Sequence, residues 1–139
     1  MNMILNPYLN FNNQTKEAME FYHSVLGGKL TMQTFAEAGM STSPEEKDLI
    51  IHARLDFDDM VIMSSDGGKD HPVDMGNNIH LSLVGPDEKK LTEWFNKLAE
   101  SGKVDMPLQK QFWGDIYGQL TDKFGIHWMV NIGSTKSQL

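Results

Sequence analysis

The chain has 139 residues, a formal net charge of -7 and no cysteine, so we expect one ordinary domain whose core needs no covalent cross-links. The lack of cysteine excludes disulfides, thiolate nucleophiles and sulfur-ligated zinc, and the negative charge argues against a nucleic-acid partner. The first residues carry no basic leader, and no stretch is apolar for long enough to span a bilayer. We therefore expect a cytoplasmic protein with no membrane partner.

Alternating apolar and polar residues recur at strand length along the chain. They predict strands at 5–11, 29–35, 49–57, 60–65, 79–84, 104–112, 117–121 and 127–132. Apolar residues at helical spacing follow the first of these segments and again the fifth, so each half predicts a strand, a helix and three further strands. We expect Asn13 or Thr15 to cap the first helix and Asp87 to cap the second, with Gly27-Gly28 and Gly102 as left-handed stops.

The two halves also share a sequence echo. The pair Phe21-Tyr22, followed by Gly28-Lys29-Leu30, matches Trp94-Phe95, followed by Gly102-Lys103-Val104, at an offset of about 73 residues. We interpret this as a degenerate internal repeat within a single domain at 1–139, with a first module at 1–68 and a second at 76–134. The turn-rich stretch Asp66–Pro72 is the expected linker.

Several predicted strands have a second face that is polar or mixed. In the segment 49–57, for example, Ile50, His52 and Arg54 alternate with apolar residues that are expected to pack under a helix. Solvent is the ordinary surrounding of such a face. A mixture of aromatic, thioether and polar side chains is also typical of a small-molecule site, and we favour that interpretation here.

The histidines and tryptophans supply the candidate site residues. His52 and His80 are placed where they could face one cavity, and two imidazoles with a carboxylate would be enough for a catalytic metal. No acidic residue occupies a matching strand position, so we predict neither a metal site nor a cofactor. We expect Trp94 and Trp128 in the core and Trp113 near a ligand.

The acidic residue Asp115 stands just before a predicted strand. A turn role, in which its carboxylate accepts hydrogen bonds from backbone amides, is the simpler interpretation. A catalytic role is the alternative. No glycine-rich phosphate loop follows any predicted strand, which also argues against a bound S-adenosylmethionine.

In its motifs the chain resembles the PhnB-like branch of the vicinal oxygen chelate superfamily, which has the glyoxalase and bleomycin-resistance fold. The motifs are Pro7-Tyr8-Leu9-Asn10-Phe11, Glu17-Ala18, Phe21-Tyr22, Leu26-Gly27-Gly28, His52-Ala53-Arg54-Leu55, 112–118 and 120–128. The resemblance implies an α+β fold of two βαβββ modules, with curved mixed sheets around a cup, and a homodimer. It also implies a divalent metal in the enzymes of the superfamily, held at positions that fall near Asn6, Met63, Asn78 or His80, and Met129.

These positions depart from the pattern of the enzymes, because carboxamide and thioether groups are poor ligands for a hard divalent cation. We therefore predict a cup without a strong metal site that binds a small, partly apolar molecule. Its expected contacts are Tyr8, His52, His80, Trp113, Tyr117 and Met129. The alternatives are a divalent-metal-dependent isomerase, lyase or dioxygenase, and a homodimeric protein without catalytic activity.

Overall fold

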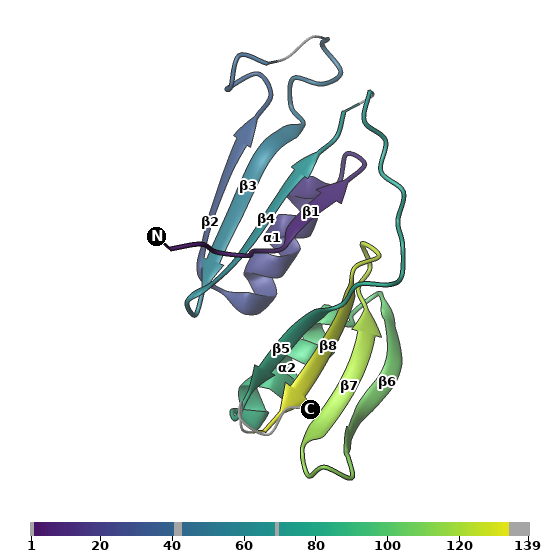
Figure 1. Cartoon of the computed structure of the whole chain (residues 1–139). Coiled ribbons are helices and arrows are strands. Elements are labelled where there is room, and N and C mark those ends of the chain that lie inside the picture. Colours follow the sequence, from purple (N-terminus) through teal and green to yellow (C-terminus); the bar gives the residue numbers. More distant parts are fainter. Residues whose placement is uncertain (1, 41–42, 69, 134–139) are drawn as a thin grey trace. The chain divides into compact units, whose positions relative to one another are not determined.

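A computed structural model describes residues 2–40, 43–68 and 70–133 of the chain. The residues divide into two compact units, Met1–Asp74 and Met75–Leu139. Each unit contains one helix and one four-stranded sheet (Figure 1). No helix within the described ranges is long and apolar enough to cross a membrane.

The first unit is built from five elements in chain order. They are β1 (Tyr8–Phe11), α1 (Thr15–Leu26), β2 (Lys29–Thr34), β3 (Ile50–Phe57) and β4 (Met60–Asp66). The strand order in the sheet is β1-β4-β3-β2, with β1 and β4 parallel and the other neighbours antiparallel. The parallel pair follows from topology, because the helix and two strands bring the chain back beside β1 in the same direction.

The second unit repeats this plan. Its elements are β5 (Leu81–Gly85), α2 (Glu88–Leu98), β6 (Lys103–Lys110), β7 (Ile116–Thr121) and β8 (His127–Ile132). The order β5-β8-β7-β6 has the same pattern of one parallel and two antiparallel pairs. The predicted α+β fold of two βαβββ modules with mixed sheets is therefore confirmed, and neither sheet closes on itself.

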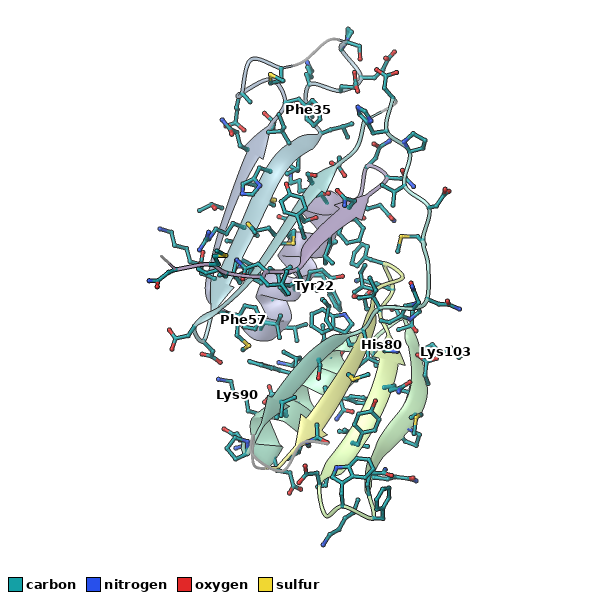
Figure 2. All side chains as sticks on the ribbon, in the orientation of Figure 1. Tyr22, Phe35, Phe57, His80, Lys90 and Lys103 are labelled. Atoms are coloured by element: carbon teal, nitrogen blue, oxygen red, sulfur yellow. The ribbon has the colours of Figure 1, made fainter. Side chains whose placement is uncertain are left out.

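Each core lies between the helix and one face of its own sheet. In the first unit it consists of Phe11, Ala18, Met19, Tyr22, Val25, Leu26, Ile50, Ala53, Leu55, Phe57 and Ile62. In the second it consists of Leu83, Leu91, Trp94, Phe95, Leu98, Leu120, Trp128, Val130 and Ile132. Tyr22, labelled on α1 in Figure 2, is fully buried. The prediction that Trp94 and Trp128 belong to the core is confirmed.

The start of α1 differs from the expectation. Neither Asn13 nor Thr15 caps the helix; the N-cap position is Gln14, whose side chain makes no capping hydrogen bond. The carboxylate of Asp66, at the end of β4, accepts from the backbone N–H of Thr15 at 3.1 Å. Its other oxygen accepts from the N–H of Ile50 at 2.9 Å. Asp66 is therefore a buried part of β4 and not the first residue of a linker.

The start of α2 follows the expectation. The side chain of Asp87 accepts from the backbone N–H of Lys90 at 3.0 Å, as an N-cap residue should. The predicted end of this helix was wrong in one detail. Ser101, with a φ of 60°, takes the left-handed conformation that was expected of Gly102. Glycine is required at 102 for another reason: a Cβ there would meet the carbonyl oxygen of Thr121 in β7.

Two strands begin two or more residues later than predicted. β1 starts at Tyr8, and Leu5, the predicted first residue, is 99% exposed. Pro7 carries no N–H and contributes only its carbonyl oxygen, which accepts from the N–H of Met63. Regular pairing therefore begins after this proline. β5 starts at Leu81, opposite Trp128, since its partner β8 begins only one residue earlier.

The expected face of Ile50 was also wrong. The pairing of β2 with β3 shifts at this point, with Gln33 opposite His52 and Thr34 opposite Ile50. Ile51 is the extra residue of the resulting irregularity, and such a residue reverses the alternation of faces. Ile50 is accordingly buried in the core.

Candidate functional site

The face of the first sheet that points away from α1 presents a hydrogen-bonded pair of rings. Tyr8 lies opposite Met63, which in turn lies opposite Arg54, so the three residues form one row across the sheet. His52 shares this face because it is two residues from Arg54 along β3. The hydroxyl of Tyr8 lies 3.1 Å from Nδ1 of His52, and the ring centroids are 5.8 Å apart.

A charged pair lies beside these rings. Nε of Arg54 donates to one carboxylate oxygen of Asp56 at 2.9 Å, and a second guanidinium nitrogen donates to the other oxygen at 2.9 Å. This hydrogen bonding holds the pKa of Asp56 below its usual range and raises the pKa of Arg54. The guanidinium is thus already engaged by a carboxylate, and this face offers no unpaired arginine to an anionic ligand.

In the second unit, β7 determines which side chains face away from the helix. Leu120 is completely buried, and a Cβ at Gly118 would lie 3.0 Å from Cε2 of Phe95 on α2. Both residues therefore point toward α2. Because successive side chains of a strand alternate, Tyr117 and Gln119 point away from it.

Tyr117 is the centre of a small cluster on this open face. The side-chain nitrogen of Gln119 donates to the hydroxyl oxygen of Tyr117 at 2.8 Å. The hydroxyl of Tyr117 donates to the sulfur of Met129, on β8, at 3.5 Å. All three side chains are partly exposed, so the cluster is open to small molecules in solution.

Two further aromatic rings adjoin this cluster from the turn between β6 and β7. The ring of Trp113 lies edge-on to that of Tyr117, with centroids 6.0 Å apart. Phe112 packs perpendicular to Trp113 at 4.9 Å and is itself 90% exposed. Trp113 and Tyr117, both predicted as ligand contacts, are therefore neighbours, and their contact with a ligand stays a prediction.

His80 belongs to a separate cluster of the second unit, at the start of β5 (Figure 2). Its ring centroid lies 5.5 Å from that of His127 on β8. Nδ1 of His127 lies 2.9 Å from the hydroxyl oxygen of Thr121, and that hydroxyl donates to Asp105 at 2.7 Å. Nε2 of His127 lies 3.1 Å from the carbonyl oxygen of Gly76.

The buried carboxylate of Asp115 accepts from the side-chain nitrogen of Asn131, on β8, at 2.8 Å, a partner that the sequence analysis did not predict. Its expected role in the turn before β7 stays a prediction. Asn131 lies opposite Tyr117, on the face that points away from α2, and is nevertheless buried there beside Asp115. A carboxylate held in this way supports the strand pairing of β7 with β8, and we assign it no catalytic role.

The six predicted contacts fall into three local groups. Tyr8 and His52 touch each other in the first unit, while Trp113, Tyr117 and Met129 form a chain of contacts in the second. His80 contacts His127. Whether all six contact one ligand stays a prediction. The sequence analysis did not predict Gln119 or His127 as site residues. Each lies two residues along the strand from a predicted contact, Gln119 from Tyr117 and His127 from Met129, and so shares its face.

Hollows elsewhere in the first unit do not involve these six residues. One, of about 280 Å³, is lined by Asn12, Asn13, Glu45, Glu46, Leu49, Gly68 and Pro72. Another, of about 360 Å³, surrounds the turn between β3 and β4. Both are rich in acidic side chains, which differs from the mixed aromatic character expected of the ligand site.

The chain belongs to the glyoxalase/bleomycin resistance protein/dioxygenase superfamily, whose family model matches residues 4–130. It is 31% identical to protein YjdN of Escherichia coli over 144 residues, covering 94% of this chain and 95% of that protein. Its structure is similar to that of protein PA1353 from Pseudomonas aeruginosa, with a TM-score of 0.82 and 37% identity over 96% of this chain and 99% of the other. The PhnB protein from Bacillus cereus shares the fold, with a TM-score of 0.77 and 24% identity over 94% and 100% of the two chains.

The residues at the metal positions that the family resemblance implies do not fit a divalent cation. Asn6 and Asn78 offer neutral carboxamides, Met63 and Met129 offer thioethers, and only His80 is a good ligand. The sulfur of Met129 already accepts the hydroxyl of Tyr117. Within the described ranges, no group of three or more His, Asp or Glu side chains is arranged to hold a metal. We therefore derive no chemical step through a metal.

Proposed function

We propose that this chain binds a small, partly apolar molecule and that Trp113, Tyr117 and Met129 form the main contact surface. The observation that supports this most directly is the continuous contact of an indole, a phenol and a thioether on an open sheet face. Such a surface combines large apolar area with one polar group, as ligand sites do. Tyr8, His52 and His80 are proposed as further contacts.

The test replaces Trp113 with alanine and measures the binding of a library of aromatic and aliphatic fragments by ligand-observed NMR. Loss of the indole removes a large part of the apolar surface, so we expect the affinity of the bound fragments to fall about tenfold or more. The matched control is Met60→Ala, which removes an exposed apolar side chain from the start of β4 in the other unit. Equal affinities for the wild type and Trp113→Ala would contradict the proposed site.

The metal-dependent alternative makes a separate prediction. A metal-dependent isomerase, lyase or dioxygenase of this fold would retain about one divalent cation per chain after exposure to zinc, nickel, manganese or iron(II) and removal of loosely bound metal. The donor set described above leads us to expect no such retention. Elemental analysis measures it, and stoichiometric retention that is lost in His80→Ala would overturn our assignment.

We further propose that the chain forms a homodimer. Large apolar side chains are exposed, among them Leu5 at 99%, Phe112 at 90% and Ile79 at 72%. Contacts between copies would remove such side chains from water. Light scattering coupled to size-exclusion chromatography should give twice the monomer mass, and a monomer mass at all concentrations tested would contradict the proposal.

A further inference from the structure

We propose that the ligand of this site is an uncharged molecule with a planar apolar body and a carbonyl oxygen, and that Tyr117 donates its hydroxyl proton to that oxygen. This inference rests on the proposed function and specifies the chemical class of its ligand. It follows from the hydrogen-bond partners of Tyr117, from the side chains around it and from the charge of its surroundings.

The hydroxyl of Tyr117 has a weak acceptor for its proton. Gln119 donates to the hydroxyl oxygen at 2.8 Å, so this oxygen already serves as an acceptor. The hydroxyl proton is directed at the sulfur of Met129 at 3.5 Å. A thioether is a weak acceptor, whereas a carbonyl oxygen is a strong one. A ligand carbonyl can therefore take the proton from the sulfur with a net gain.

The bond from Gln119 also strengthens Tyr117 as a donor. When a hydroxyl oxygen accepts a hydrogen bond, the bond that its own proton makes becomes stronger. The amide thus both fixes the direction of the hydroxyl and improves its donation. The open face places this donor where a ligand can reach it, because Gly118 and Leu120 take the positions toward α2.

The neighbouring side chains suit an apolar, planar body. Trp113 stands edge-on to Tyr117, and Phe112 stands edge-on to Trp113. Aromatic rings favour edge-to-face and offset contacts with other planar groups. The thioether of Met129 adds a polarizable and adaptable contact next to the hydroxyl.

The electrostatics favour a neutral ligand over an anion. The carboxylate of Asp115 bonds to Asn131, and Asn131 is the residue of β8 directly opposite Tyr117. The chain as a whole carries a net charge of -7. The side chains hydrogen-bonded to Tyr117 are an amide and a thioether, neither of which would neutralise a bound carboxylate or phosphate.

The experiment compares two probes that differ only in the acceptor. These are 2-acetylnaphthalene, which has a ketone oxygen, and 2-ethylnaphthalene, in which a methylene replaces that carbonyl. Their dissociation constants for the full chain are measured by equilibrium dialysis. One hydrogen bond of ordinary strength should make the wild type prefer the ketone by about 3- to 10-fold.

Three variants assign that preference to the hydroxyl of Tyr117. Tyr117→Phe removes the donor and should reduce the ratio of the two constants to about one. Gln119→Glu supplies a carboxylate that accepts the phenol proton, so it should also abolish the preference. Met129→Leu removes the competing sulfur while keeping the apolar contact, so the preference should persist or increase. Thermal midpoints close to that of the wild type show that the variants are folded.

The outcomes separate this inference from the proposed function. If both probes bind the wild type equally, or if Tyr117→Phe keeps the preference, the carbonyl-binding role is overturned while the site itself stands. If neither probe binds at its solubility limit, the ligand class is overturned. The proposed function is then decided by the fragment measurements on Trp113→Ala, which do not depend on a carbonyl.

Discussion

At the scale of single residues, two buried polar side chains differ in their hydrogen bonding: one has several partners and the other has none among the described residues. Asp122, 3% exposed, accepts from the backbone N–H groups of Phe124 and Ile126 and from the indole N–H of Trp128. Ser64 is completely buried, and its hydroxyl has no hydrogen-bond partner among the described residues. The cost of burying a polar group depends on this difference.

We expect Asp122→Ala to lower the free energy of unfolding by about 3 kcal/mol, because it leaves three donors without their charged acceptor. Asp122→Asn keeps one acceptor oxygen and should cost less. Chemical denaturation followed by far-UV circular dichroism measures both. If the alanine variant were as stable as the wild type, the carboxylate would contribute nothing to the turn between β7 and β8.

We expect Ser64→Ala to have the opposite sign, raising the free energy of unfolding by about 1 kcal/mol. The substitution removes an unsatisfied hydroxyl and keeps the Cβ that packs on the core face. The neighbouring Ser65→Ala is the matched control, since Ser65 lies on the other face of β4 and should change stability little. Destabilisation by Ser64→Ala would show that the hydroxyl has a partner after all.

Sequence patterns predicted large side chains better than polar ones. Trp94 and Trp128 were assigned to the core from apolar periodicity alone, and this was correct. The partners of Asp66 and Asp115 were not predicted, because each accepts from residues distant in sequence. An aspartate in the sequence does not reveal whether its carboxylate caps a neighbouring helix or accepts hydrogen bonds from residues distant in the sequence.

At the scale of elements, the two helices begin in different ways although the modules share one plan. α2 is capped by the residue before its first turn, whereas α1 depends on a carboxylate of β4 that also holds the start of β3. The start of the helix is thus stabilised by a neighbouring residue of the sequence in the second module and by a residue distant in the sequence in the first.

This difference predicts unequal effects of alanine at the two caps. Asp87→Ala should cost about 1 kcal/mol, the ordinary value for an N-cap. Asp66→Ala should cost about 3 kcal/mol, because it leaves the N–H groups of Thr15 and Ile50 buried and unpaired. Denaturation curves of the two variants, compared with that of the wild type, test the order. Equal losses would mean that water replaces the carboxylate at the start of α1.

The type and order of the elements could be predicted from the sequence, while several boundaries could not. Period-two alternation is strong in 49–57 and 127–132, and strands occupy both segments. The extra residue Ile51 leaves no trace in a pattern of apolar residues, because isoleucine fits either face. The predicted start of β1 was three residues too early, because Pro7 lacks the N–H that regular strand pairing would use.

At the scale of the whole chain, the two units place a glycine at the same point of the repeat. A Cβ at Gly28, before β2, would meet the carbonyl oxygen of Asp56 in β3. A Cβ at Gly102, before β6, would meet the carbonyl oxygen of Thr121 in β7. The internal sequence repeat therefore extends beyond the helices. Gly28 allows β2 to approach β3, and Gly102 allows β6 to approach β7.

We expect Gly28→Ala and Gly102→Ala each to destabilise the unit that contains it by about 2 kcal/mol or more, because a backbone atom cannot move aside as a side chain can. Hydrogen exchange measured by mass spectrometry should show faster exchange in α1 and β2–β4 for the first variant and in α2 and β6–β8 for the second. Equal acceleration in both units by either variant would instead mean that the chain opens as one cooperative body.

Sequence reasoning predicted the repeated architecture because the repeat is carried by periodicity and glycine positions. It could not predict how Trp113, Tyr117, Gln119 and Met129 combine. That cluster depends on the register of β7 with β8, which places Gln119 opposite Met129, and on the burial of Leu120 toward α2.

The two helix caps also bear on the order in which the chain folds. Asp87 and the N–H that it caps are 3 residues apart, so α2 can be stabilised before any strand has paired. Asp66 and the N–H of Thr15 are 51 residues apart, and closing that loop requires β4 to be in place. We therefore expect the helix of the second module to form early in folding. The helix of the first module should become stable only after its sheet, so the two copies of one architecture would be assembled in opposite orders.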